Sequence, residues 1–266
     1  MSREPARAAF ECFGGACEVF AVGARVDGAE VWARERHARY SRFDAGSELS
    51  RLNAAAGRWV DVSAELEAML RAALEAYDTS GGLVHAGVLP ALVAAGYGRD
   101  LGDGPTPHTA AAPPRPLPEM LEVARGRARL APDTSVDLGG IAKGFLADRL
   151  AAELGDNALV NFGGDLYARG GGPEGAGWPV GFGDRTVLLR DMGAATSGTW
   201  KRAWGPGLHH LIDPRTGAPA ATDLREASVL APTAAEAETF AKTALLLGSA
   251  RAEAWLVGRS AGWWLA

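Results

Sequence analysis

The chain has 266 residues, of which 47% are hydrophobic and 22% charged, and its formal net charge is −5. A chain of this length and composition can bury a substantial core, as one large domain or two closely packed subdomains, which argues against intrinsic disorder. The acidic balance without basic clusters gives no electrostatic footprint for nucleic acid, so the expected partner is a small molecule or a protein.

The cysteines and the N-terminus give no sign of export. Cys12 and Cys17 are too few for a disulfide framework, and without a further cysteine their spacing does not favour a zinc site. Residues 1–7 lead into no apolar segment of the signal-peptide kind, and no stretch approaches eighteen uncharged apolar residues. We therefore expect free thiols, no membrane span and a cytoplasmic location.

The first eighty residues are typical of one strand followed by two helices. A strand is expected over residues 16–22, directly after a Gly-Gly turn. Asp27 is expected to cap the first helix and Ser63 the second, because both side chains can accept hydrogen bonds from helix N–H groups. The apolar positions on one helix face are Ala29, Trp32, Ala33, Tyr40 and Phe43, and then Leu66, Met69, Leu70, Ala73, Leu74 and Tyr77.

A proline-rich segment divides the chain. Residues 101–118 contain six prolines and few large apolar residues, which indicates a surface loop or a hinge between subdomains. We treat residues 1–266 as a single domain with this loop as the best candidate boundary. A hairpin is expected next, over residues 121–130, turning at Gly126.

Residues 137–149, DLGGIAKGFLADR, are typical of a strand that runs through glycines into a helix. Gly139 and Gly140 let the backbone approach a ligand closely, and the N–H groups at a helix start favour phosphate oxygens. Lys143 would add a point charge one turn into the helix. The pattern is neither a P-loop nor a dinucleotide fingerprint, so an anion site and a plain corner with a solvated lysine both remain open.

The second half of the chain predicts a sheet followed by helices. Short β-like runs separated by glycine-rich turns lie at 158–162, 166–169, 178–182, 186–190, 194–197, 208–212 and 227–231. A capping box at residues 233–236 begins a long helix, another helix is expected over 249–257, and a last strand over 262–265. The mixture of elements predicts an α+β fold with an antiparallel or mixed sheet.

Several polar residues in this half are candidates for chemistry. Asp165, after two glycines, either orients ligand hydroxyls or closes a turn, and Ser197 with Gly198 has the same ambiguity. His210 is the acid–base candidate because its ordinary pKa permits proton transfer near neutrality. Successive strand residues face opposite sides, so only one of His209 and His210 can point into a given pocket. A buried, hydrogen-bonded strand histidine is the alternative.

Several of these segments together resemble one family. Residues 136–144, VDLGGIAKG, resemble the D-L-G-G-I-A-K-G signature of the ApbE-like FAD:protein FMN transferases. Further motifs follow in the expected order at residues 41–43 with 47–53, 159–165, 196–198, 210–217 and 231–233. The match covers about residues 10–266. It implies an α+β fold with a mostly antiparallel sheet, flanking helices and a T-fold-like architecture of two subdomains.

The resemblance also implies an activity and its residues. The substrate would be FAD, and FMN would be attached to a Thr or Ser hydroxyl of a partner protein with release of AMP. His210 would serve as base, Lys143 and the amides near Gly140 would hold phosphates, and Asp137 would fix the loop or an FAD hydroxyl. Further contacts with the nucleotide are implied at Phe13, Gly164, Asp165, Ser197, Gly198 and Leu211. Two alternatives are an FAD-binding protein without catalysis and an FAD pyrophosphatase that gives FMN and AMP.

The chain departs from the family pattern at the implied metal site. The family pattern implies a magnesium ligand at the Gly140 carbonyl, with Asp and Thr four residues apart on the last long helix. This chain has Glu238 and Lys242 at those positions. A protonated lysine has no lone pair and repels a divalent ion, so we expect a weakened or altered site. Either Lys242 takes over part of the charge neutralisation, or a magnesium site is displaced by a residue or two, or the protein binds FAD without catalysis; an ordinary surface ion pair is the plain alternative.

Overall fold

A seven-stranded antiparallel sheet forms the centre of the computed structural model, which describes residues 4–55 and 57–266. Three residues of the N-terminal segment 1–7 lie outside the described part. The strand order is β1-β2-β6-β7-β10-β15-β16, and every pairing in it is antiparallel. The strands are β1 (Ala6–Cys12), β2 (Gly15–Ala21), β6 (Ala158–Phe162), β7 (Asp165–Arg169), β10 (Met192–Gly198), β15 (Glu226–Ala231) and β16 (Gly262–Leu265).

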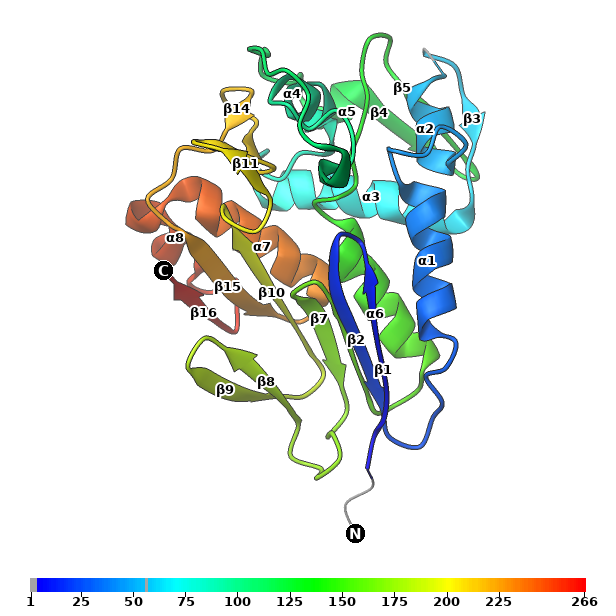
Figure 1. Cartoon of the computed structure of the whole chain (residues 1–266), viewed down its shortest axis with the longest axis vertical. Helices are drawn as coiled ribbons and strands as arrows, with labels where there is room; N and C mark the ends of the chain where they lie inside the picture. Colours follow the sequence, from blue (N-terminus) through cyan, green and yellow to red (C-terminus); the bar gives the residue numbers. More distant parts are fainter. Residues whose placement is uncertain (1–3, 56) are drawn as a thin grey trace.

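Different elements cover the two faces of this sheet (Figure 1). The helices α6 (Ala142–Glu153) and α7 (Ala234–Leu247) pack on one face, and α8 (Ser249–Leu256) packs against α7. A hairpin of β8 (Trp178–Phe182) and β9 (Arg185–Leu189) covers the other face. Because strand side chains alternate between faces, Leu159 packs with the hairpin residue Trp178 while the next residue, Val160, packs with the helices.

A further group of elements lies beside α6 and joins the main core, with α1 (Ala29–Tyr40) packed directly on β1. It contains α1, α2 (Glu48–Asn53), α3 (Ala64–Thr79), α4 (Leu89–Ala94) and α5 (Leu117–Met120), with the small sheet of β3 (Val60–Asp61), β5 (Arg127–Leu130) and β4 (Leu121–Ala124). Short pairs of β11 (Ala203–Gly205) with β12 (Leu208–His209), and of β13 (Ile212–Asp213) with β14 (Ala218–Pro219), complete the fold. Two single 3-10 turns lie at Ala86–Val88 and Leu101–Asp103.

The α+β prediction is confirmed, and so are several local details. Strands β6 and β8 have the predicted bounds, the hairpin of β4 and β5 is present, and Ser63 accepts the Leu66 N–H as its helix cap. Thr233 and Glu236 form the predicted capping box. Residues 104–116 of the proline-rich segment form neither helix nor strand. Within the described residues no helix is both long and apolar enough to cross a membrane.

Other local predictions were wrong. Asp27 does not cap α1, because Gly28 is the N-cap and the Asp27 carboxylate is held by Arg25. Phe43 lies beyond the end of α1 and is 40% exposed. Strand β1 and helices α2 and α4 were not predicted; β1 has a largely exposed pattern that gives little periodic signal.

The segment before the Gly139-Gly140 turn is not a strand. Its backbone bonds instead to a side chain. Asn53 donates to the Val136 carbonyl at 2.9 Å and accepts the Val136 N–H at 2.8 Å. The Asp137 N–H bonds to the Ala86 carbonyl. One amide side chain therefore replaces a neighbouring strand and fixes the approach to the turn.

The predicted strand over residues 208–212 is also broken. His210 and Leu211 lie between the two-residue strands β12 and β13. The His210 N–H bonds to the Arg202 carbonyl, and the Leu211 N–H bonds to the ring of His209. The two histidines therefore occupy different environments at an irregular point of the backbone.

Candidate functional site

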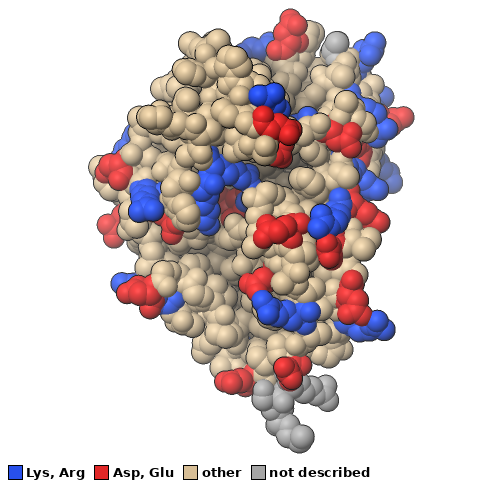
Figure 2. Space-filling view, viewed as in Figure 1, with Lys and Arg blue, Asp and Glu red and all other residues tan. Residues whose placement is uncertain are grey.

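One cavity of about 560 Å³ lies at the end of the large sheet where β6 and β10 end and β2 and β7 begin. Its size falls within the roughly 300–1,000 Å³ of small-molecule and cofactor sites. Figure 2 shows the surface hollowed on this side, with basic side chains at the edge of the hollow. The charged residues in the lining are Arg36, Arg42, Asp100, Asp137, Lys143, Asp165, Lys201, Arg202, Glu238 and Lys242.

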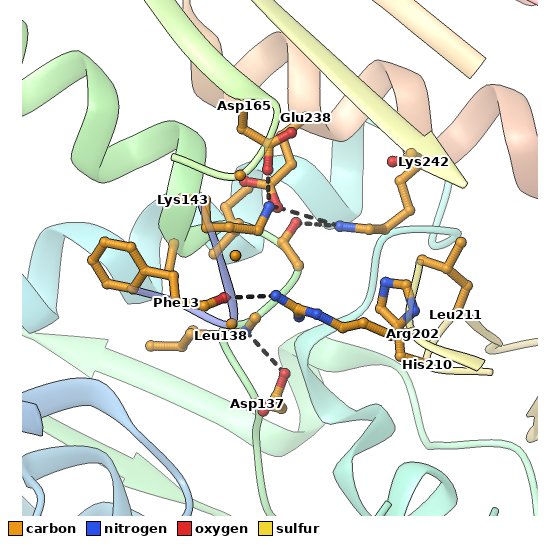
Figure 3. Close-up of a pocket in the computed structure, with 18 of the residues that line it drawn as sticks. Phe13, Asp137, Leu138, Lys143, Asp165, Arg202, His210, Leu211, Glu238 and Lys242 are labelled. Atoms are coloured by element: carbon orange, nitrogen blue, oxygen red, sulfur yellow. Dashed lines mark hydrogen bonds and ion pairs between the residues drawn. The ribbon is translucent and has the colours of Figure 1, made fainter. Parts of the chain in front are cut away.

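The structure brings the predicted site residues together in this cavity. The lining includes Phe13, Asp137, Gly140, Lys143, Gly164, Asp165, Ser197, Gly198, His210, Leu211 and Glu238. They come from six separate segments of the chain, and several lie together in Figure 3. His209 is not part of the lining. The individual roles of these residues stay predictions.

Asp137 fixes the glycine turn from below. Its carboxylate accepts the Gly139 N–H at 2.8 Å and forms an ion pair with the Arg42 guanidinium at 3.0 Å. Arg42 also donates to the Tyr97 carbonyl at 2.6 Å, and only 6% of its side chain is exposed. A charge-assisted pair with a buried arginine holds its geometry, so Asp137 positions the backbone at Gly139 and Gly140.

The start of α6 is less open to an anion than the sequence pattern suggests. The helix has no side-chain cap of its own, and Ile141 is its N-cap. The Ala142 N–H already bonds to the Leu138 carbonyl, and the Gly144 N–H donates to Glu238 at 2.9 Å. The expected cradle of free N–H groups is therefore partly filled, and side-chain cations supply most of the positive charge here.

Four charged side chains form a compact cluster at this point (Figure 3). The Lys143 ammonium contacts Asp165 and lies 3.2 Å from Glu238 Oε1. The Lys242 ammonium lies 3.6 Å from the same oxygen and donates to the Gly140 carbonyl at 2.6 Å. Glu238 and Asp165 are 2% and 3% exposed, and the two lysines about 15%. The cluster is therefore shielded from water. Charge interactions are stronger in such a low-dielectric environment than in water.

Burial and mutual charge shift the pKa values in this cluster. Burial lowers the pKa of Lys143 to about 8, although the Glu238 carboxylate opposes the shift. Burial also lowers the pKa of Lys242, again against Glu238. Burial alone would raise the pKa of Glu238, but the two ammonium groups outweigh it and keep that pKa lowered. Glu238 is therefore an anion balanced by two cations.

Arg202 is a site residue that sequence reasoning missed. It reaches across the cavity from the loop after β10 and donates to the Phe13 carbonyl at 2.6 Å. Phe13 holds a left-handed φ of 53°, which aims its carbonyl at Arg202. Lys201 approaches Gly164, where a Cβ would lie 3.3 Å from the ammonium. The one available signal was the basic pair that closely follows Ser197 and Gly198.

His210 is buried beside these cations, and its Nδ1 atom has no hydrogen-bond partner. Burial, and then the positive charges of Arg202, Lys242 and Lys143, lower its pKa well below 6.5. His209 differs because its ring contacts the Ala220 carbonyl at 3.2 Å and accepts the Leu211 N–H. His210 is thus the histidine that lines the cavity with a neutral ring and a buried Nδ1 atom that has no partner.

A divalent ion does not fit the ligands that the family pattern implies. The Gly140 carbonyl already accepts a hydrogen bond from Lys242, and Glu238 faces two ammonium groups. Among the described residues, no three His, Cys, Asp or Glu side chains are grouped to hold a metal. The residues present therefore do not make a conventional magnesium site.

Comparison with known proteins gives a consistent picture. A family model described as the ApbE family matches residues 15–262. A FAD:protein FMN transferase of Treponema pallidum (strain Nichols) is 32% identical over 242 residues, which cover 76% of this chain and 65% of that protein. The protein of the same name from Haemophilus influenzae is 30% identical over 255 residues, 84% of this chain and 72% of its own length. The chain thus matches about two thirds of the first relative's length.

Solved structures share the fold. The apo form of Pseudomonas stutzeri flavinyl transferase ApbE has a TM-score of 0.83 at 19% identity, covering 100% of this chain and 96% of that one. The ApbE protein of Thermotoga maritima has a TM-score of 0.79 at 20% identity, covering 95% and 89%. At such identities the likeness concerns the arrangement of helices and strands.

Proposed function

The chain belongs to the ApbE family, and from this premise we propose that it moves FMN from FAD to a Thr or Ser hydroxyl of a partner protein, releasing AMP. The cavity lining runs from Phe13 to Lys242. The activity therefore needs nearly the whole described chain, in keeping with a single functional domain.

One observation carries the proposal. His210, whose pKa is lowered and whose buried Nδ1 atom has no partner, lines the same cavity as several cations. At pH 7 the His210 ring is neutral and can accept a proton. Lys143, Arg202 and Lys242 bring positive charge to the same place, as a pyrophosphate requires. A base and an electrostatic clamp together are the requirements of phosphoryl transfer to a hydroxyl.

The proposed reaction balances with these residues. The acceptor oxygen attacks the phosphorus of the FMN half, forming a new P–O bond, and the P–O bond to AMP breaks. His210 takes the proton of the attacking hydroxyl, and AMP leaves with the electron pair of the bridging oxygen. The cations stabilise the negative charge that spreads over the phosphoryl oxygens as the bond breaks. Asp137 keeps the glycine turn in place through Gly139 and Arg42.

The decisive experiment compares the two adjacent histidines. His210→Ala should lower FMN transfer by about 100-fold or more, the usual scale for a lost general base, with little change in FAD affinity. His209→Ala should lower it much less, because that ring only bonds to backbone groups. An acceptor peptide with a threonine, scored for covalent flavin fluorescence after denaturing electrophoresis, gives the rate. Equal rates in the two variants would sink the assignment of His210.

Two further measurements separate the alternatives. AMP and FMN formed without an acceptor peptide would favour FAD hydrolysis, in which water replaces the acceptor hydroxyl. Titration calorimetry should show that FAD binds more tightly than FMN, because the cation cluster fits a pyrophosphate. FAD binding without AMP release under any condition would favour a protein that only holds the nucleotide.

A further inference from the structure

Lys242 occupies the position in which a site of this kind would hold a small cation. Its ammonium donates to the Gly140 carbonyl at 2.6 Å and lies 3.6 Å from Glu238 Oε1. A backbone carbonyl and a carboxylate are the oxygen ligands that hard cations prefer. A Cβ on Gly140 would lie 2.9 Å from the ammonium, so the glycine makes this close contact possible.

The pair is not a surface pair of the common i, i+4 kind. Glu238 is 2% exposed and the Lys242 side chain 15%. Both oxygens of Glu238 are engaged, since Oε2 accepts the Gly144 N–H and Oε1 faces the two ammonium groups. A divalent ion would have to displace an ammonium or lie beside it without water between them, where repulsion is strong.

The charge of the cavity fits a pyrophosphate without an added metal. Six basic and four acidic side chains line it, which leaves two positive charges. The pyrophosphate diester of a dinucleotide carries two negative charges. Arg36 is also paired with Glu65 outside the lining, so the excess is small, but it is positive and comes from the protein's own residues.

We propose that Lys242 is the permanent cation of the phosphate subsite and that this chain carries out its reaction without a divalent metal. This inference rests on the proposed function for the reaction, and on the contacts of Gly140 and Glu238 for the place of the cation. The Lys242 ammonium faces the pyrophosphate from the Gly140 side and stabilises the charge that develops on the departing AMP. Glu238 is a positioning residue that keeps the lysine on the carbonyl.

The test measures AMP release in EDTA and in magnesium. The wild-type rate should be the same in both conditions. Lys242→Thr should fall by on the order of 100-fold in EDTA, the scale of one lost charge-stabilising group, and should recover partly in magnesium. The recovery is expected because threonine leaves an oxygen beside the Gly140 carbonyl and Glu238. Lys242→Met keeps the length without charge or oxygen, so its rate should stay low in both conditions.

Lys201→Thr is the matched control, because it removes a charge from the same cavity away from the Gly140 carbonyl. Its rate should show no magnesium dependence, whatever its value. A wild-type rate that rises tenfold or more with magnesium would overturn the inference. Circular dichroism of each variant confirms that a low rate does not reflect unfolding.

A second readout keeps this inference separate from the proposed function. If no variant releases AMP, the transferase proposal fails, and FAD affinity then decides the role of Lys242. FAD should bind the wild type equally in EDTA and in manganese, and only Lys242→Thr should gain FAD affinity from manganese. Manganese-dependent FAD binding by the wild type would overturn the lysine's role.

Discussion

At the starts of both α6 and α7, a carboxylate from the other helix accepts backbone N–H groups, but the charges around the two carboxylates differ. At α7, the Ala234 and Ala235 N–H groups donate to Asp148, which belongs to α6, at 2.8 and 3.0 Å. At α6, the Gly144 N–H donates to Glu238, which belongs to α7. Each helix therefore has an N-terminal N–H group bonded by a carboxylate from the other.

The charges around the two carboxylates differ. Burial raises the pKa of Asp148 to about 6, although two backbone N–H groups oppose the shift. Glu238 has two ammonium groups beside it, and its pKa is lowered despite its burial. A carboxylate on a helix start is thus a structural feature in both places, and Glu238 differs in having two ammonium groups beside it.

The largest expected difference between the two helix starts comes from neutralising the carboxylates of Glu238 and Asp148 in separate variants. Glu238→Gln keeps an oxygen for the Gly144 N–H but removes the carboxylate between Lys143 and Lys242, so that only Asp165, on Lys143, still offsets their repulsion. We expect FMN transfer to fall by on the order of 100-fold. Asp148→Asn should leave the rate nearly unchanged. Comparable rates for the two variants, measured by flavin fluorescence of the acceptor peptide, would show that the two ends do not differ in function.

A smaller effect is expected from the packing between the two helices. A Cβ on Gly144 would lie 2.5 Å from the Ala234 carbonyl oxygen, so Gly144→Ala must push the helix starts apart. We expect a loss of about 2 kcal/mol in the free energy of unfolding, measured in urea. Gly28→Ala, with nothing within 4 Å of its Cβ, is the control and should change stability by less than about 0.5 kcal/mol. Equal losses would refute the close contact.

The smallest effect is a pH dependence carried by Asp148. Its folded pKa of about 6 exceeds the ordinary 3.8, so the folded state binds this proton more tightly. The stability that protonation adds is fully present below about pH 3.8 and is lost as the pH rises through 6. Relative to Asp148→Asn, the wild type should therefore gain roughly 1 to 1.5 kcal/mol between pH 7 and pH 5. Urea unfolding of both proteins at the two pH values measures the difference, and parallel changes would contradict the raised pKa.

Local sequence patterns were sufficient for much of the fold. The β-like run over residues 158–162 and the capping box at Thr233 depend on neighbouring residues, and both predictions were confirmed. The turn at Gly139 and Gly140 was located from the resemblance and from its glycines. The strand predicted before it was wrong because Asn53, far earlier in the chain, satisfies the Val136 backbone.

The remaining features of the site depend on contacts between distant residues. The Phe13 carbonyl meets Arg202 across 189 positions, and Gly144 meets Glu238 across 94. The hydrophobic periodicity of a sequence reports only on neighbouring residues and therefore does not predict such pairs. The position of Lys242 on the family pattern raised the question of a metal, but only the structure shows its ammonium on the Gly140 carbonyl.

The exchange of carboxylates between α6 and α7 has a consequence for folding kinetics. Asp148 and Glu238 each complete the other helix, across separations of 86 and 94 residues. Neither helix start gains its partner until the chain between them has closed, and contacts of such long separation form slowly. The cation cluster is built at this junction, so we expect it to appear late, with the docking of the two helices. A partly folded chain would then have β-hairpins and helices but no place for a dinucleotide.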